Sequence, residues 1–322
     1  MIRSFLSLSQ ISPGFTEAEE ILTFRLNITP QEVPDQEEVP VAHEQMARRL
    51  AELPGVTSVG LSTSVPMDGL AGFDPVFFED FPLAEGQSPQ LRTFKRVGGN
   101  YPETMGNPVI SGRSITWEDV HNRARVVVIA ENVAREVFGD PGAAVGRRLS
   151  TGLEPGDWRE IVGVVGDERD EGMEQRVTDL VYWPMAMRDY FDTPSVISRS
   201  MAYAVRSPRS GTPDFLAEVR NAVWSAYPSR PLGAMVTMDV RQRNSMARTS
   251  FTLVMLVIAA SVTLLLGSIG IFGVISYVVS QRTQELGLRK AMGAQAGSVA
   301  GLVVRQGFVL AISGVAAGIA IA

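Results

Sequence analysis

The chain has 322 residues, with 29 Lys and Arg against 35 Asp and Glu, so its net charge at pH 7 is −6. It contains no Cys and only two His, which excludes disulfides and leaves few side chains for metal or nucleophilic chemistry. The net charge is −12 over residues 1–240 and +6 over residues 241–322. The long acidic part is large enough for a buried core and argues against a nucleic-acid partner.

The first predicted unit is a strand, a helix and a second strand. Residues 21–28 and 56–65 are rich in β-formers, and residues 41–53 between them have the spacing of a helix that ends at Pro54. The apolar side chains of this helix are Val41, Met46, Leu50 and Leu53.

Residues 99–198 are predicted as a β-rich subdomain with its own core. A continuous apolar run at residues 125–130 suits a buried strand, and a helix is expected over residues 132–138. Further strands are expected at residues 158–167 and 180–184.

A second strand, helix and strand unit follows at residues 201–205, 212–226 and 233–238. Thr212 and Pro213 have the residue types that begin helices. We therefore expect residues 1–98 and 199–240 to form one α+β domain of two split βαβ halves, with residues 99–198 inserted between them.

The C-terminal part is predicted to cross a membrane. No charged residue or His occurs from Phe251 to Ser280, and a helix of this length rises roughly 45 Å against a hydrocarbon core of about 30 Å. The loop 281–305 is basic, which places it in the cytoplasm and the large domain outside. Residues 306–322 are also uncharged and are expected to be a truncated second span, so the chain is expected to be a fragment.

No catalytic motif is visible in the sequence. There is no Gly-Lys-Ser/Thr phosphate loop, no nucleophile elbow and no His-Glu-x-x-His. His43 and His121 are expected to be ordinary surface residues. The acidic stretch at residues 167–174 lacks the ligand spacing of a Ca²⁺ site, so a solvated loop is favoured over calcium binding.

Small residues recur at helical spacing in both apolar stretches. Because small side chains let helices approach closely, they are candidates for helix packing, although Gly is also common in membrane helices generally. These residues are Gly267, Gly270, Gly273, Gly314 and Gly318.

Residues 269–294 resemble the FtsX-like permease domain of type VII ABC transporters, the MacB and lipoprotein-releasing group. Five motifs in the first part resemble the MacB-type periplasmic core, and the whole is most similar to the duplicated orphan permeases of acidobacteria. The motifs are Leu53–Val56, Tyr101–Gly106, Ser111–Arg113, Gly146–Arg147 and Ile161–Asp167.

The resemblance implies a non-enzymatic subunit of a bacterial inner membrane ABC transporter, with two porter-like halves in the periplasm. ATP would be bound by a separate cytoplasmic ATPase, which would move the transmembrane helices and through them the periplasmic domain, for export or extraction of a substrate. A second permease copy or duplicated half and the bilayer would be the other partners. The ATPase-coupling residues would be Arg282, Glu285, Arg289 and Lys290.

Two alternative interpretations suit the same sequence. The amphipathic stretch that begins at Arg282 also suits a helix held on the membrane surface by lipid phosphates. The whole chain also suits a membrane-anchored extracytoplasmic binding or sensor module that couples to no ATPase.

Overall fold

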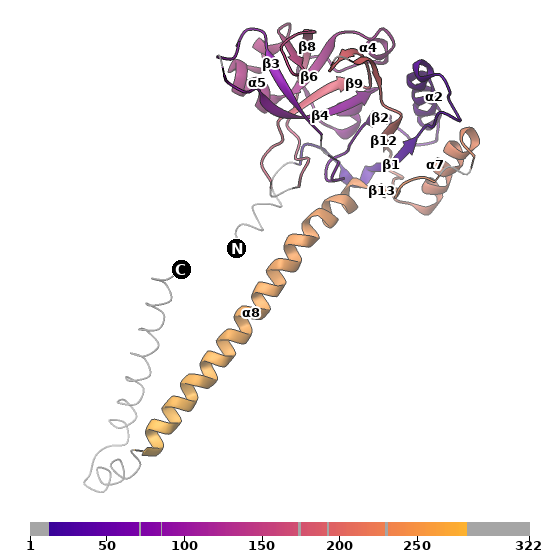
Figure 1. Ribbon diagram of the computed structural model, residues 1–322. Coiled ribbons are helices and arrows are strands. Elements are labelled where there is room, and N and C mark those ends of the chain that lie inside the picture. The colour runs from indigo at the N-terminus through magenta and orange to yellow at the C-terminus, as the bar shows by residue number, and fades with distance from the viewer. Residues whose placement is uncertain are drawn as a thin grey trace. The chain divides into compact units, whose positions relative to one another are not determined.

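The computed structural model describes residues 13–70, 72–84, 86–172, 175–191, 193–228 and 231–281. The chain divides into two compact units, Met1–Ala247 and Arg248–Ala322. The first unit contains all of the strands described, and helix α8 runs from the first unit into the second (Figure 1).

The strands are β1 (Ile21–Asn27), β2 (Ser58–Ser62), β3 (Gly72–Phe78), β4 (Gln90–Gly98), β5 (Val109–Gly112), β6 (Val126–Ala130), β7 (Arg148–Thr151), β8 (Arg159–Val165), β9 (Leu180–Pro184), β10 (Ala186–Tyr190), β11 (Thr193–Ile197), β12 (Ser200–Arg206) and β13 (Val236–Thr237). The helices are η1 (Ala18–Glu20), η2 (Gln36–Glu38), α2 (Val39–Ala51), α3 (Tyr101–Met105), α4 (Trp117–His121), α5 (Glu131–Phe138), α6 (Pro141–Ala144), α7 (Pro213–Ala226) and α8 (Met238–Gln281).

The two predicted strand, helix and strand units interleave in one sheet. The strand order β13-β1-β12-β2 inserts β12 between β1 and β2, and inserts β1 between β12 and β13. All three pairings are antiparallel, so each unit is a split βαβ half that is completed by a strand of the other. The α+β class predicted from the sequence is confirmed.

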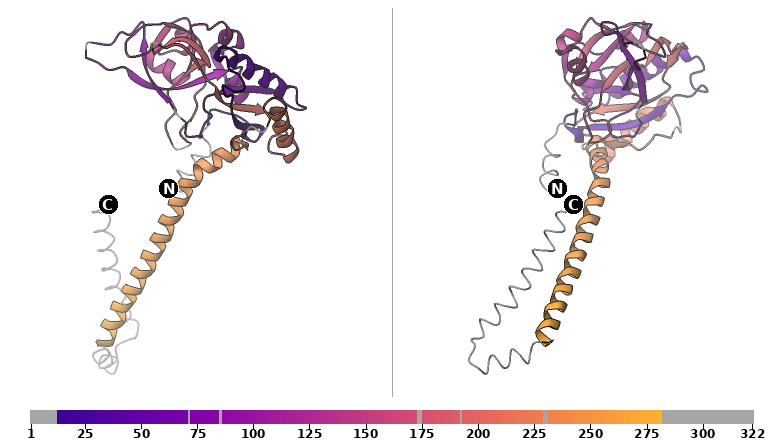
Figure 2. Two further views of the ribbon diagram at one scale, coloured as in Figure 1. Left: turned by 45° about the vertical axis from the view of Figure 1, so that its right-hand side comes forward. Right: turned by 60° about the vertical axis from the view of Figure 1, so that its left-hand side comes forward.

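Helices α2 and α7 cover one face of this sheet and lie side by side in the views of Figures 1 and 2. The Arg49 guanidinium of α2 donates to Ser225 Oγ at 2.9 Å near the end of α7. Helix α3 packs on the opposite face, where a Cβ on Gly60 of β2 would lie only 2.6 Å from Tyr101 Cα. Strand β2 therefore packs against α2 on one face and against α3 on the other.

Helix α2 begins two residues before the predicted start, and this changes which side chains are buried. Val39, His43, Met46 and Leu50 recur every three or four residues and are all buried. Val41, predicted on the apolar face, is instead 41% exposed, because Val39 takes the buried position.

The prediction that His43 lies on the surface is wrong. Its side chain is fully buried between α2 and β12, with Nδ1 2.8 Å from the Tyr203 hydroxyl and Nε2 3.2 Å from the Arg199 carbonyl oxygen. Because a carbonyl only accepts, Nε2 carries the proton and Nδ1 accepts from Tyr203. Burial lowers the pKa of His43 to about 4, so this imidazole is neutral at pH 7. His121, by contrast, is exposed as predicted.

A second group of strands forms a closed circuit of pairings, β4-β3-β7-β8-β6-β9, in which β9 returns to pair parallel with β4. Strand β5 extends this group along β8, and β10 and β11 form a separate hairpin. Alternate side chains of β6 enter two apolar clusters, Val126 and Val128 in one and Val127 and Ile129 in the other. Because both faces of β6 are buried, its sequence is a continuous apolar run rather than an alternating one.

Strand pairing continues across the predicted boundary at residue 98. Strand β4 pairs with β2 of the first sheet and with β3 and β9 of the circuit, so no break in the hydrogen-bond ladder marks that point. The division into residues 1–98 with 199–240, residues 99–198 and residues 241–322 therefore stays a prediction.

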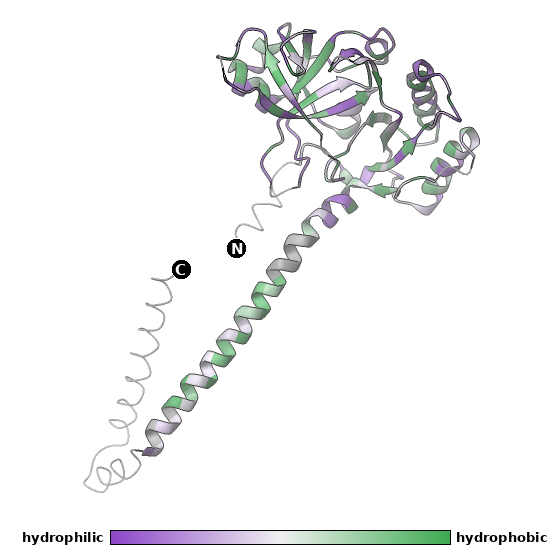
Figure 3. Ribbon diagram, viewed as in Figure 1, coloured by the Kyte–Doolittle hydropathy of each residue, from purple (hydrophilic) through white to green (hydrophobic). Residues whose placement is uncertain are grey.

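Helix α8 begins thirteen residues before the apolar run, because its first turns are polar and self-paired: the Arg243 guanidinium lies 2.7 Å from Asp239 one turn earlier. The strand predicted at residues 233–238 is shorter in the structure and is β13. It ends before Met238, because Met238 already belongs to the helix. Within α8, Val254–Val274 is long and apolar enough to cross a membrane, and none of it is buried (Figure 3). At 1.5 Å per residue this segment rises about 30 Å, the thickness of a hydrocarbon core.

Candidate coupling site at the root of helix α8

The first turns of α8 are attached to the edge of the interleaved sheet, where β13 is the last strand. Strand β13 pairs antiparallel with β1, with Thr23 opposite Val236, and the helix begins at the next residue but one. Met238 is fully buried in the larger apolar cluster. The root of the helix, Met238–Ala247, is thus joined to the domain by a strand pairing and by an apolar anchor.

Thr23 of β1 is the polar centre of this attachment. Its hydroxyl donates to the Val236 carbonyl at 2.8 Å and accepts from Arg241 Nε at 3.0 Å. Burial lowers the pKa of Arg241, with the nearby carboxylate of Asp68 acting in the opposite direction, but a guanidinium stays charged at neutral pH. Arg241 therefore holds a positive charge against the sheet one turn into α8.

A neighbouring ion pair secures the loop that follows β2. The Arg25 guanidinium lies 3.2 Å from Asp68 Oδ2 and also donates to the Thr63 carbonyl at 2.8 Å. Asp68 accepts in addition from the backbone amides of Val65 and Leu70, at 3.0 and 2.9 Å. Both oxygens of this carboxylate accept hydrogen bonds that hold the loop beside the root.

The acidic stretch at residues 167–174, predicted as a solvated loop, is partly buried. Lys95 of β4 is fully buried and its Nζ lies 2.6 Å from both Glu168 Oε2 and Asp170 Oδ1, whose side chains are 1% and 4% exposed. The prediction failed because the sequence did not reveal a buried Lys 73 residues away from Glu168. A buried cation with two carboxyl groups is stable only with close pairing.

Two tyrosines complete the surroundings of Lys95. The Tyr182 hydroxyl donates to Glu168 Oε2 at 3.2 Å, and the Tyr101 ring lies 5.9 Å from Nζ. Burial works against the charge on Lys95, but the carboxylates of Asp170 and Glu168 outweigh it and raise the Lys95 pKa. Burial raises the pKa of Glu168, opposed by Lys95.

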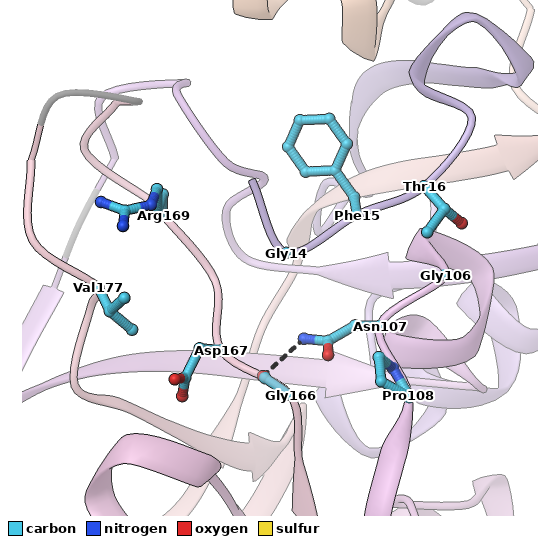
Figure 4. Close-up of a pocket in the computed structure, with 10 residues that line it drawn as sticks. All are labelled: Gly14, Phe15, Thr16, Gly106, Asn107, Pro108, Gly166, Asp167, Arg169 and Val177. Atoms are coloured by element: carbon cyan, nitrogen blue, oxygen red, sulfur yellow. Dashed lines mark hydrogen bonds between the residues drawn. The ribbon is translucent and has the colours of Figure 1, made fainter. Parts of the chain in front are cut away.

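A cavity of about 380 Å³ lies beside this loop (Figure 4). It lies between residues 13–16, here called the incoming segment, and the end of α3. Asn107 lines it and donates from Nδ2 to the Gly166 carbonyl at 2.9 Å. Asp167, also in the wall, accepts from the Asn132 amide at the start of α5 at 2.8 Å. These polar groups hold the wall of the cavity together.

Most of the residues predicted for function cannot be placed. Arg282, Glu285, Arg289 and Lys290 lie outside the described residues, as do Gly314 and Gly318. The other three, Gly267, Gly270 and Gly273, lie on α8 and meet no atom of the described chain within 4 Å of an added Cβ. Their role in helix packing stays a prediction.

Sequence reasoning missed the root of α8 and the Lys95 cluster. One signal was present for the helix. The polar stretch that contains Arg241 lies directly before the apolar run, so the helix could have been predicted to begin within that stretch. Among the residues that the structure describes, no group of three or more acidic, Cys or His side chains is placed to hold a metal. The arrangement around the root fits mechanical attachment.

The fold and the root together define an α+β domain whose edge strand β13 leads into a helix that contains a candidate membrane span. Residues 7–222 match the MacB-like periplasmic core domain, and residues 257–322 match the FtsX-like permease C-terminal domain. The first match covers most of the chain, so the chain belongs to the MacB/FtsX-like family of ABC permeases.

Similar proteins include two macrolide export ATP-binding/permease proteins MacB. The protein of Chromobacterium violaceum is 28% identical over 234 residues, and that of Paracoccus denitrificans is 25% identical over 252 residues. These matches cover 70% and 78% of this chain but 34% and 36% of the relatives. The pyoverdine export ATP-binding/permease protein PvdT of Pseudomonas fluorescens is 25% identical, with 70% and 34% covered. The chain thus spans about a third of the length of these relatives.

Solved structures resemble the first unit loosely. The periplasmic region of MacB from Actinobacillus actinomycetemcomitans has a TM-score of 0.44 at 14% identity, covering 74% of this chain and 97% of that one. A domain of a putative permease from Porphyromonas gingivalis has a TM-score of 0.41 at 17% identity, covering 69% and 92%. Family membership rests on the sequence matches, and the finer placement among acidobacterial duplicated permeases stays a prediction.

Proposed function

We propose that this chain is part of the transmembrane subunit of a MacB-type ABC transporter, in which a cytoplasmic ATPase moves a periplasmic domain through helix α8. The observation that carries the proposal is that one unbroken helix, Met238–Gln281, contains both the root in the sheet and the candidate span Val254–Val274. A helix transmits displacement along its axis because its backbone is hydrogen-bonded throughout. The chain itself is then a non-enzymatic partner of the ATPase.

The cytoplasmic end of this pathway is proposed at Arg282, Glu285, Arg289 and Lys290. These residues follow α8 directly and would contact the ATPase, which would bind ATP itself, so no cofactor is assigned to this chain. The names of the relatives support export as the direction of transport, since MacB is a macrolide exporter and PvdT a pyoverdine exporter by name. The proposed process is either export of a substrate from the periplasm or extraction of a substrate from the membrane.

Membrane and partners follow from the same proposal. The subunit would lie in the bacterial inner membrane, with Met1–Ala247 in the periplasm and a second permease copy or duplicated half beside it. Reporter fusions test the orientation: a reporter after Gly152 should be active only outside, and one after Ala291 only in the cytoplasm. Activity of both on one side would contradict it.

The coupling itself is tested by breaking the helix between root and span. Insertion of Gly-Pro after Ala247 interrupts the backbone ladder of α8 at a point where Pro costs about 3 kcal/mol or more. In the complete gene product reconstituted with a candidate partner ATPase, we expect the insertion to abolish ATP-driven transport. An insertion of Ala-Ala at the same place keeps the helix and controls for added length, although it rotates the two ends by about 200°. A Gly-Pro variant with normal transport would refute coupling through α8.

The alternative, a sensor or binding module without an ATPase, is decided by the same preparation. A sensor would neither bind the ATPase nor change its rate of hydrolysis. Absence of both, with a correctly folded and inserted chain, would favour that alternative.

A further inference from the structure

The loop Asp167–Gly172 makes a different contact at nearly every position. Asp167 caps α5, since its Oδ1 accepts from the Asn132 amide at 2.8 Å. Glu168 and Asp170 turn inward to Lys95 of β4, each at 2.6 Å from Nζ. The side chains of this loop therefore fix it to the strand circuit from inside.

The backbone of the same loop holds the segment by which the chain comes into the domain. The Arg169 amide donates to the Pro13 carbonyl at 3.0 Å. Gly14 has φ +89°, and a Cβ at that position would lie 2.3 Å from the Asp167 carbonyl oxygen. The incoming segment thus lies directly against the loop backbone.

The loop also reaches the two structures next to the α8 root. The Asp170 carbonyl accepts from the Met67 amide at 2.7 Å, and Met67 precedes the Asp68 that pairs with Arg25. Gly172 is buried and has φ +131°, and a Cβ added there would lie 3.0 Å from Ser245 Oγ of α8. One six-residue loop therefore contacts the incoming segment, the outgoing helix and the strand circuit.

We propose that the loop Asp167–Gly172 is the element that relays displacement of α8 into the strand circuit, with Lys95 as the positioning residue that keeps it stiff. This inference rests on the proposed function. An exposed acidic loop would yield when α8 moves, whereas a loop pinned by an ion-pair cluster that is at most 5% exposed moves together with β4. Gly suits position 172 because φ +131° is a backbone conformation that other residues rarely adopt, and because it places no side chain against Ser245 Oγ of α8.

The test is a double-mutant cycle on the contact with α8, in the complete gene product with its ATPase in nanodiscs. The readout is the change in hydrogen exchange of the β4 and β9 peptides when Mg²⁺ and ATP are added. We expect Gly172→Ala to reduce this change at least threefold, and Ser245→Ala combined with it to recover part, because removal of Oγ gives the new methyl space. Gly86→Ala is the matched control, since Gly86 also has positive φ (+83°) but has no atom within 4 Å of an added Cβ.

A second variant tests the stiffness of the loop. The triple substitution Lys95→Met, Glu168→Gln, Asp170→Asn removes the charges at similar volume, so the strands are expected to stay protected while the ATP-dependent change falls at least threefold. Equal responses of Gly172→Ala and Gly86→Ala, or an unchanged response of the triple variant, would overturn the inference. A wild type that shows no ATP-dependent exchange at the α8 root would instead count against the proposed function, so the two failures are distinguishable.

Discussion

Protonation of the unfolded chain at His43 is expected to make the periplasmic domain less stable in mild acid. The imidazole is fully buried, its pKa is about 4 in the folded state, and its ordinary value is 6.5. Between these two values the unfolded chain binds a proton that the folded chain refuses, so stability is complete above pH 6.5 and falls as the pH drops toward 4.

The magnitude follows from the difference in pKa. One pKa unit corresponds to about 1.4 kcal/mol, so the contribution of His43 falls by about 2 kcal/mol between pH 7 and pH 5, and by about 3 kcal/mol at pH 4. The narrower window is the better one, because ordinary carboxylates titrate mainly below pH 5.

The measurement is urea unfolding at pH 7 and pH 5, followed by tryptophan fluorescence in detergent, for wild type and His43→Gln. The Gln variant should be less stable at pH 7, because Tyr203 and the Arg199 carbonyl lose well-placed partners, but its loss of stability between the two pH values should be smaller by about 2 kcal/mol. His121→Gln removes the other imidazole, whose Nε2 lies 2.5 Å from Glu44 Oε2, and shows how far loss of a His paired with a carboxylate changes the pH dependence by itself. An equal pH dependence of wild type and His43→Gln would refute the assignment of a neutral buried imidazole.

Three further predictions each compare a substitution with a control variant or with a second assay. Leu50→Ala should lower the free energy of unfolding by about 2–5 kcal/mol, because Leu50 is fully buried, whereas Val41→Ala should cost less than about 1 kcal/mol; equal losses in urea unfolding would show that the buried face of α2 is misassigned. Gly163→Ala should cost about 1–3 kcal/mol or more, since its Cβ would lie 2.0 Å from the Arg113 carbonyl oxygen, whereas Gly156→Ala meets no atom and should be near neutral by the same assay. Glu285→Lys should weaken stimulation of the ATPase if it docks there, but should strengthen membrane attachment by about 1 kcal/mol if the segment only lies on anionic lipid, so ATPase and vesicle-partitioning assays separate the two.

Local patterns in the sequence were enough to predict the two strand, helix and strand units, but not the strand order β13-β1-β12-β2 in which they interleave. Thr212 and Pro213 begin α7 as expected, with Thr212 Oγ1 accepting from the Phe215 amide at 3.4 Å. The apolar run of β6 and the span in α8 were also found, because each is a property of consecutive residues. The pairing of β4 with β9 was not, because it joins strands that are far apart in the chain.

The buried polar groups were beyond reach for the same reason. Lys95 and Glu168 are ordinary surface residues by type, and only the fold brings them together. His43 could have been found, since it lies three and seven residues before Met46 and Leu50 on one helical face. The prediction for His43 followed the usual exposure of His and not the helical periodicity, although the periodicity was the better guide to burial.

The central claim is that ATP hydrolysis in the cytoplasm moves the periplasmic domain through the root of α8. The most direct measurement is hydrogen exchange of the peptide Met238–Ala247 in the complete transporter, with Mg²⁺ and ATP and with no nucleotide. We expect exchange at this root to change with ATP in the wild type and to stay the same when Gly-Pro is inserted after Ala247. Normal ATP hydrolysis with unchanged exchange at the wild-type root would show that α8 does not transmit the movement.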